Sequence, residues 1–583
     1  MDIQKQFTDR IGSAIVSTNT QLPFEPTIES YKLWEEELPI LNLQISAEIL
    51  SDAAKGLLST NIKAINKFNL AEEAMPCLYR LYLVCNQEIE NAKLPLTKKQ
   101  NISSSTLISL LTNFGNVYLD IASSKDFLSS ETIEQGEKKQ IFTDSQRGSV
   151  ICRAFELLGL TQFLMVKIYM IPKFNFWNPV NALFDLANNL DMRHLECTML
   201  SEHNRTTIEN EFKKIQLLYL SFPNRFRQND IATIQSILTQ QVNEILISQT
   251  NNGSFGFYVD LSTSAPANYL PISTSTSYKT FFINNEQLVS FMQSDKVIAH
   301  ERHNFIAIHS DSPVLTKKVI KQLLSSWTTK HARQSQRQTK TEEISVYPGF
   351  ESIIKAILIQ QNPDLYKKEP STFANPNSMD IPNLELLPID NQRRHHTVYT
   401  DSMANKMLKA SIDDEFTTKN IWQKKHSVKP GAKGQELAAQ TSDMSKEGMR
   451  FTINNNNKAL LKTSDVIGIQ LEAQPLQLAI IRYINNSNEG SISVGVELIA
   501  SGLQVASIQS LDDTVASKAA IFLKGTHSNE NIDTLISPVF IENTDIKIVL
   551  KKGKEKTYFV IERTMESNQV FTKYAVSIQS NLG

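Results

Sequence analysis

The spacing of apolar residues divides the chain into a helical part and a strand-rich part. Across residues 45–248 apolar side chains recur at intervals of three and four, as at Ile45, Ile49 and Ala53, the pattern of amphipathic helices. Turn or helix-start residues interrupt it at three places, 101–105, 172–179 and 222–224. We therefore expect residues 1–250 to form helical hairpins packed in a bundle or short solenoid, which would serve as a scaffold or docking domain.

The pattern changes beyond residue 250. Shorter alternating runs and one further helical run predict a mixed α/β connecting region over residues 251–330. Residues 331–350 contain a basic stretch followed by a candidate strand at 343–347. Residues 351–434 are predicted to be a polar linker or an insertion, because from residue 362 onward they are rich in Asn, Pro, Asp, Lys and Ser.

Strict alternation marks the C-terminal part, as at Ile492, Val494 and Val496. Two hairpin loops, 485–490 and 551–556, separate pairs of such runs. Residues 435–583 are therefore predicted to be all-β, as one barrel with a β extension or as two abutting small barrels. The fold class that follows is α+β, with a mainly helical N-terminal region and a C-terminal β-barrel.

Composition narrows the class of partner. The chain has 583 residues, of which 41% are hydrophobic, and its 59 Lys and Arg against 61 Asp and Glu give a net charge of −2. Such a balance gives no reason to expect duplex nucleic acid or an anionic membrane as a partner. The most apolar stretch, residues 150–171, carries Arg153, Glu156 and Lys167, so we interpret it as a buried helix and expect no membrane span.

The cysteines and the N-terminus favour a cytoplasmic protein. Cys77, Cys85, Cys152 and Cys197 lie in helical patterns without CxxC spacing, so we expect small buried hydrophobes in a reducing compartment. The first residues lack a basic segment followed by an apolar core, the arrangement of a secretory signal.

No catalytic constellation emerges. His300 and His303 have a spacing that would place two imidazoles on one helical face, but no third ligand accompanies them. His309, Ser310 and Asp311 are adjacent, which a catalytic triad does not allow, and there is no phosphate-binding loop of the Walker type. We expect neither enzymatic activity, nor a metal, nor a cofactor.

The strongest functional signal is the pattern Asp443-x-Ser445-x-x-Gly448, just ahead of the alternating strands. A carboxylate accepts from two ring donors at once, a hydroxyl donates or accepts beside it, and glycine permits a close approach or a positive φ. The N1 and N2 donors of a guanine edge suit such a site. Taken alone, the hexapeptide is equally typical of a turn in which Asp and Ser cap main-chain groups.

With the strands at 478–483 and 493–498 behind it, the motif resembles the PilZ domains, which bind the bacterial second messenger cyclic di-GMP on a small β-barrel. The resemblance covers residues 435–500, a minority of the chain. It implies that the Asp443, Ser445 and Gly448 motif reads guanine, and that an R-x-x-x-R loop ahead of the first strand holds the phosphates.

Arg333 and Arg337 match that loop and precede a candidate strand. Planar guanidinium groups fork onto phosphate oxygens, which lysine does poorly. Their position departs from the family pattern, because 106 residues (443 − 337) separate Arg337 from Asp443, so the pairing requires a long insertion after the first barrel strand. Two alternatives stay open: Lys425 and Lys429 have the spacing with lysine chemistry, and the domain could lack a phosphate clamp.

The whole layout also resembles the larger cyclic di-GMP effectors of the FimW-like type, which are linked to surface attachment and type IV pili. This resemblance implies a receptor that signals through a protein partner bound by the helical region. Ordering of the arginine loop on ligand binding would be the signal. The alternative is a nucleotide-independent scaffold with a degenerate PilZ-like barrel.

Overall fold

The computed structural model forms two compact units. Unit 1 comprises Met1–Val297, Lys317–Gln334 and Tyr483–Ser493, and unit 2 comprises Ile298–Thr316, Ser335–Arg482 and Val494–Gly583. The structure describes residues 3–12, 20–39, 42–90, 94–128, 142–199, 205–251, 256–271, 277–293, 297–300, 305–308, 314–328, 338–361, 436–445, 447–454, 461–472, 474–487, 491–510, 518–525, 532–538, 546–552, 555–567 and 570–578.

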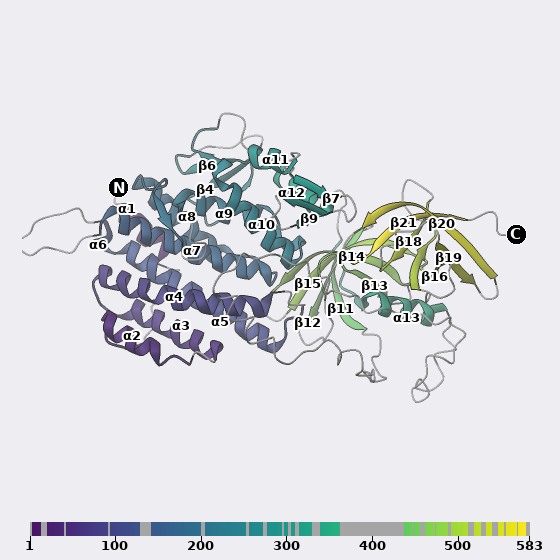
Figure 1. Cartoon of the computed structure of the whole chain (residues 1–583), viewed down its shortest axis with the longest axis horizontal. Helices are drawn as coiled ribbons and strands as arrows, with labels where there is room; N and C mark the ends of the chain where they lie inside the picture. Colours follow the sequence, from purple (N-terminus) through teal and green to yellow (C-terminus); the bar gives the residue numbers. More distant parts are fainter. Residues whose placement is uncertain are drawn as a thin grey trace, which may run out of the picture. The chain divides into compact units, whose positions relative to one another are not determined.

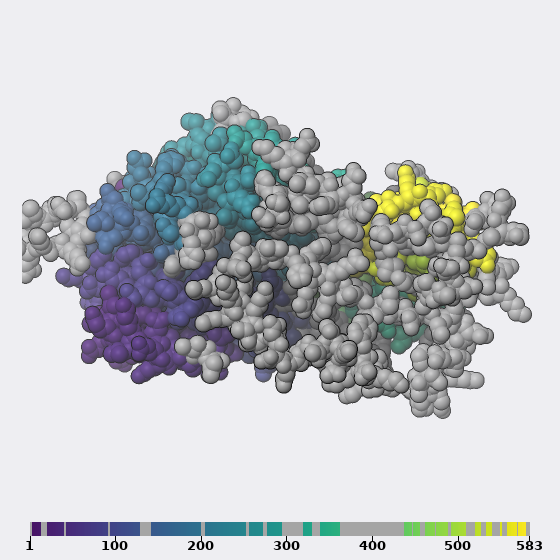
Figure 2. Space-filling view, viewed as in Figure 1, coloured from purple at the N-terminus to yellow at the C-terminus, as the bar shows by residue number. Residues whose placement is uncertain are grey.

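Unit 1 is dominated by helices, as the apolar spacing predicts (Figure 1). Its helices are α1 (Ile3–Ile11), α2 (Ile28–Glu36), α3 (Leu43–Ser59), α4 (Ala64–Ile89), α5 (Lys98–Ser123), α6 (Lys125–Leu128), α7 (Asp144–Lys167), α8 (Phe174–Asn189), α9 (Ile208–Leu220), η1 (Pro223–Arg225), α10 (Gln228–Gln241), η2 (Val242–Glu244), α11 (Glu286–Gln293) and α12 (Lys317–Thr328). The side chains of the N-terminal helices close into a continuous surface, purple in Figure 2.

The helix break expected at residues 101–105 is wrong. α5 begins three residues earlier, at Lys98, because Thr97 and Gln100 form a capping box at its N-terminus. The serines that suggested a break bond inside the helix, where the hydroxyl of Ser104 donates to the main-chain oxygen of Asn101 and that of Ser105 to Ile102. Serine hydroxyls can bond back to the preceding turn in this way, so they do not end the helix.

α7 is the one described helix long and apolar enough to cross a membrane by length and composition, and 61% of its apolar window is buried inside the structure. Its Arg153 lies between two carboxylates, with Nε 3.1 Å from Glu72 and Nη1 2.7 Å from Glu156. Lys167 at its C-terminus donates to the side-chain oxygen of Asn86 (3.1 Å). These contacts satisfy charges on a helix that packs against α5 and α9.

The expectation that all four cysteines are free is wrong for one pair. Cys152 of α7 and Cys197 of β1 (Glu196–Thr198) form a disulfide, whereas Cys77 and Cys85 are free and buried. The hairpin of β1 with β2 (Arg205–Thr207) brings Cys197 against α7. Residues 45 positions apart in sequence carry no local spacing signal, so the pairing depends on this long-range contact.

Short strands form two further sheets. A four-stranded sheet has the order β3-β6-β4-β5 and a three-stranded sheet the order β7-β8-β9. Their bounds are β3 (Leu246–Ser248), β4 (Phe257–Asp260), β5 (Asn268–Tyr269), β6 (Thr280–Asn284), β7 (Val297–His300), β8 (Phe305–Ile308) and β9 (Val314–Thr316).

A closed six-stranded barrel has the order β10-β11-β12-β15-β14-β13 and belongs to unit 2 apart from the segment Tyr483–Ser493. Its strands are β10 (Glu343–Pro348), β11 (Leu437–Met444), β12 (Gly448–Asn454), β13 (Val466–Leu471), β14 (Gln477–Asn486) and β15 (Ser491–Ser501). β10 pairs antiparallel with both β11 and β13. The barrel therefore includes a strand, β10, that precedes residues 362–435 in the sequence.

A second closed barrel follows, with the order β16-β17-β18-β21-β20-β19. Its strands are β16 (Gln504–Ser510), β17 (Lys518–Leu523), β18 (Asp533–Ser537), β19 (Ile546–Lys552), β20 (Glu555–Ser567) and β21 (Thr572–Ile578). Numbered within each barrel, both orders are 1-2-3-6-5-4. The β region therefore holds two successive barrels with the same strand order, one of the two arrangements that the alternating pattern allows.

Helix α13 (Phe350–Gln361) packs against both barrels within unit 2 (Figure 1). Residues 351–361 belong to the segment predicted to be a polar linker or an insertion; they form a helix between β10 and β11 and not a polar linker. Phe350, Ile353 and Ile357 lie at helical spacing and join a buried cluster with Leu478 of the first barrel and Ile521 of the second. The helix is held by this shared core.

Candidate functional site

The Asp443, Ser445 and Gly448 motif forms the tight connection between β11 and β12. β11 ends at Met444 and β12 begins at Gly448. The Ser445 N–H and hydroxyl both donate to the main-chain oxygen of Gly448, at 2.8 and 3.1 Å. Leu498 of β15 donates its N–H to the main-chain oxygen of Glu447 (2.9 Å). The turn is thus fixed by hydrogen bonds to its own residues and to the neighbouring strand.

Gly448 is required for a close approach of two strands. A Cβ at this position would lie 2.8 Å from the main-chain oxygen of Val496, a separation that real Cβ atoms almost never show. The sequence allowed two reasons for a glycine here, a close approach or a positive φ. The structure shows that the close approach is the reason. A larger residue would push β12 away from β15 and displace the Ser445 turn.

Asp443 faces Arg450 across the β11–β12 ladder. The two are paired in register, and Arg450 Nε lies 2.8 Å from Asp443 Oδ2. A bulge between Thr441 and Asp443 shifts the register just before this pair, and such bulges re-aim the side chain that follows them. The Asp443 side chain is 13% exposed and that of Arg450 44%, so a buried carboxylate lies beside an accessible cation.

The chain segment that follows the arginine loop runs beside this motif. Gln338 and Met444 exchange both main-chain hydrogen bonds, each 3.0 Å. Farther along, the Thr441 hydroxyl donates to the main-chain oxygen of Lys340 (2.6 Å) and accepts from the N–H of Glu342 (2.8 Å). The residue immediately after Arg337 therefore pairs with the residue immediately after Asp443.

The arginines themselves, Arg333 and Arg337, lie outside the described residues, as do Lys425 and Lys429. The choice between the two pairs stays a prediction. The structure does bring Asp443, Ser445 and Gly448 together with the main chain at Gln338. Sequence reasoning missed Arg450, although the alternation of β12 could have indicated that it shares a face of the sheet with Asp443.

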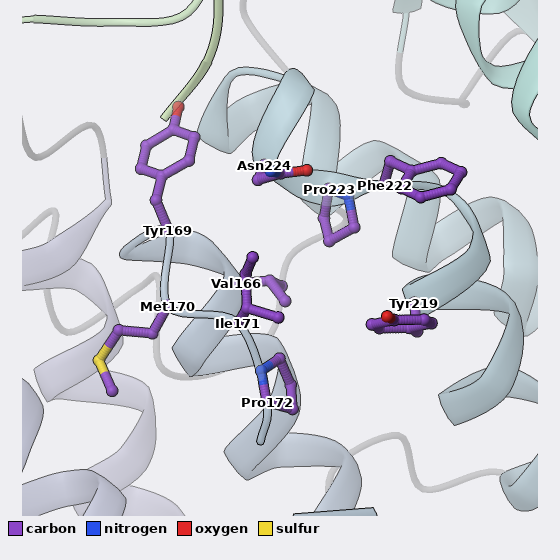
Figure 3. Close-up of a pocket in the computed structure, with 9 residues that line it drawn as sticks. All are labelled: Val166, Tyr169, Met170, Ile171, Pro172, Tyr219, Phe222, Pro223 and Asn224. Atoms are coloured by element: carbon purple, nitrogen blue, oxygen red, sulfur yellow. The ribbon is translucent and has the colours of Figure 1, made fainter. Parts of the chain in front are cut away.

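A pocket of about 180 Å³ lies in unit 1, between the C-terminal ends of α7 and α9. Val166, Ile171 and Pro172 face Tyr219 and Phe222 across it (Figure 3). Its lining is apolar apart from Asn224 and the tyrosines, and burial raises the pKa of Tyr219. The described lining has no arginine or lysine to balance phosphate charge, so this pocket does not suit an anionic dinucleotide.

Two family models match the chain, in agreement with this geometry. The first, cyclic-di-GMP receptor FimW, N-terminal domain, covers residues 29–251, and the second, cyclic-di-GMP receptor FimW, middle PilZ domain, covers residues 257–504. The chain belongs to the FimW family of cyclic-di-GMP receptors. The resemblance to PilZ proteins of the FimW-like type is thereby confirmed, as is the fold class of a helical region followed by β-barrels.

Most of the second barrel lies outside the residues that the FimW models match. The middle PilZ match runs from β4 to the first residue of β16 and so contains the first barrel with its candidate site, while the rest of the second barrel lies beyond it. The FimW family is a receptor family and not an enzyme family. Within the described residues no group of three or more His, Cys, Asp or Glu side chains is placed to hold a metal. A search of curated proteins found no match, and neither did a search of solved structures.

Proposed function

We propose that this chain binds cyclic di-GMP on its first barrel, with Asp443, Ser445 and Gly448 reading guanine and with Arg333 and Arg337 holding the phosphates. The observation that carries the proposal is the main-chain pair between Gln338 and Met444. It supports a site assembled from two distant segments, because it brings Gln338, the residue after Arg337, to the motif. Membership of a cyclic-di-GMP receptor family supports the choice of ligand.

Each residue has a distinct role in this proposal. The Asp443 carboxylate accepts from the N1 and N2 donors of guanine, and the Ser445 oxygen, whose proton is directed at Gly448, accepts a further bond. Gly448 keeps the two strands close enough to present these groups. The guanidinium groups of Arg333 and Arg337 fork onto phosphate oxygens or stack on the purine faces.

Calorimetry with cyclic di-GMP tests the site. Asp443→Ala and Arg333→Ala should each weaken binding roughly tenfold or more, since hydrogen bonds to charged groups contribute about 1.5–3 kcal/mol. Arg482→Ala is a matched control, because Arg482 of β14 pairs with Glu497 of β15 (2.7 Å) on the same barrel. Absence of binding by the wild-type chain would leave the nucleotide-independent scaffold as the better reading.

We further propose that the receptor signals through a protein partner bound by the helical unit, in surface attachment or pilus-based motility. The support for this surface is a set of large apolar side chains that remain exposed on α2 and α4: Leu33, Leu83 and Val84. Ion pairs join the same two helices, Lys32 to Glu73 and Arg80 to Glu35. Exposed apolar side chains on ordered helices are the kind of groups that a protein partner covers.

Complementation of a strain that lacks the gene separates ligand binding from partner binding. Asp443→Ala should fail to restore attachment because the ligand is not bound. Leu33→Glu with Leu83→Glu should also fail, although calorimetry should give wild-type affinity for cyclic di-GMP. Full attachment by the glutamate variant would contradict the proposed surface, and full attachment by Asp443→Ala would contradict the signalling role of the ligand.

A further inference from the structure

Arg450 lies where a residue could control the carboxylate that reads guanine. It is the register partner of Asp443, and its Nε donates to Asp443 Oδ2 at 2.8 Å. Both residues belong to the β11–β12 pair that forms the motif turn. The D-x-S-x-x-G pattern includes Asp443 but ends two residues before Arg450, so the motif itself assigns Arg450 no role.

The bond from Arg450 is compatible with a bound guanine. A carboxylate offers about four acceptor positions over its two oxygens. One bond from Arg450 and one each from the N1 and N2 donors of guanine stay within that capacity. Arg450 therefore need not leave when the ligand arrives, and its bond restricts rotation of the Asp443 side chain before binding.

We propose that Arg450 is a positioning residue: it orients the Asp443 carboxylate for the guanine edge. This inference rests on the proposed cyclic di-GMP site. A side chain that is already held in its binding orientation loses less conformational freedom when the ligand binds, and affinity rises accordingly. The bulge before Asp443 contributes to the same end, because it sets the direction from which the carboxylate meets Arg450.

A purely structural role is the alternative, and the barrel contains a comparison for it. Arg482 forms a similar bond with Glu497, with Nε and Oε2 2.7 Å apart, from a side chain that is 34% exposed. Exposed pairs of this kind contribute little to stability. If Arg450 were merely such a pair, its loss and the loss of Arg482 would have the same small consequence for ligand binding.

Two substitutions separate the hydrogen bond from the charge. Nε2 of glutamine and Nε of arginine are the same number of bonds from Cα. Arg450→Gln therefore keeps a donor at this position and removes the charge. Arg450→Met places a methyl group at that position and removes both. We expect Arg450→Met to weaken cyclic di-GMP binding roughly tenfold and Arg450→Gln to weaken it about threefold or less, with Arg482→Met unchanged as the control.

Calorimetry gives the dissociation constants, and thermal unfolding midpoints show whether the variants stay folded. Wild-type affinity in Arg450→Met would overturn the inference, and so would equal losses in the glutamine and methionine variants, since charge would then act in place of the positioning bond. The inference would likewise be overturned if both variants had lowered unfolding midpoints together with equal losses of affinity. Absence of binding by the wild type would instead overturn the proposed function.

Discussion

Gln338 and Met444 donate to and accept from each other through their main chains, and both N···O distances are 3.0 Å. Gln338 follows Arg337, and Met444 lies between Asp443 and Ser445. Two segments more than a hundred positions apart are therefore adjacent at the level of single residues. Entropy permits this, because the cost of closing a loop rises only with the logarithm of its length.

Removing the Gln338 N–H should weaken ligand binding while the barrel stays folded. Gln338→Pro deletes the donor to Met444 and restricts the main chain next to Arg337. We expect roughly tenfold weaker binding of cyclic di-GMP, since one of the two main-chain bonds between Met444 and Gln338, the residue after Arg337, is lost. Gln338→Ala keeps the main-chain pair and should bind as the wild type does; an equal loss in both variants would contradict this role.

Adding one methyl group at Gly448 should disrupt the motif turn. Because the new Cβ would lie 2.8 Å from the main-chain oxygen of Val496, β12 must shift, and overpacking of this kind costs about 1–3 kcal/mol. Urea unfolding and calorimetry should show lower stability and lost binding in Gly448→Ala. Gly256→Ala is the control, since its Cβ would meet nothing closer than 4.0 Å; wild-type binding by Gly448→Ala would refute the need for close approach.

The second barrel should contribute no dinucleotide site. It repeats the strand order of the first. However, the stretch between β17 and β18 lacks the D-x-S-x-x-G pattern, and no R-x-x-x-R pattern lies between β15 and β16. At the corresponding connection the Asp533 side chain accepts from the Gly525 N–H (2.9 Å). We expect Asp533→Ala and Lys524→Ala to leave the affinity for cyclic di-GMP within about twofold by calorimetry; a tenfold loss would indicate a second site.

The spacing of apolar residues predicted the helices and strands, because these elements depend on local sequence patterns. Helical spacing in the N-terminal region and alternation at Ile492, Val494 and Val496 follow from burial of one face of each element. The Arg450–Asp443 pair, the packing of Ile357 between two barrels and the Cys152–Cys197 disulfide depend on contacts between distant segments. One sequence does not specify those contacts, because many registers and packings satisfy the same pattern.

The buried charge network around Arg153 should matter far more for stability than exposed pairs of the same unit. The Arg153 side chain is 12% exposed and lies 2.7 Å from Glu156, which is 1% exposed. Arg153→Met removes the cation that faces this carboxylate and should lower the free energy of unfolding by about 3–5 kcal/mol. Arg80→Met removes a pair with Glu35 in which the arginine is 70% exposed, and we expect a loss of about 1 kcal/mol or less. Similar losses in urea unfolding would contradict the ranking.

The stability of the helical unit should fall between about pH 4 and pH 6 because of Asp230. Burial raises the pKa of this carboxyl to about 6, against a partial opposing effect of Arg227. Since the unfolded pKa is about 3.9, the unfolded chain loses its proton first as the pH rises. The folded state therefore binds more protons in this interval, and stability declines until the folded group also ionises near pH 6.

Asp230→Asn should remove this decline. The asparagine oxygen can still accept from the Arg227 N–H, as Asp230 Oδ2 does at 3.3 Å. At pH 7 the variant should be more stable than the wild type by roughly 2–3 kcal/mol, at about 1.4 kcal/mol per pKa unit, and the gain should shrink toward zero near pH 4. Asp52→Asn, at an exposed pair with Lys55, serves as the control. Urea unfolding at a series of pH values measures both, and a gain of equal size at pH 4 and pH 7 would show that titration of Asp230 is not its cause.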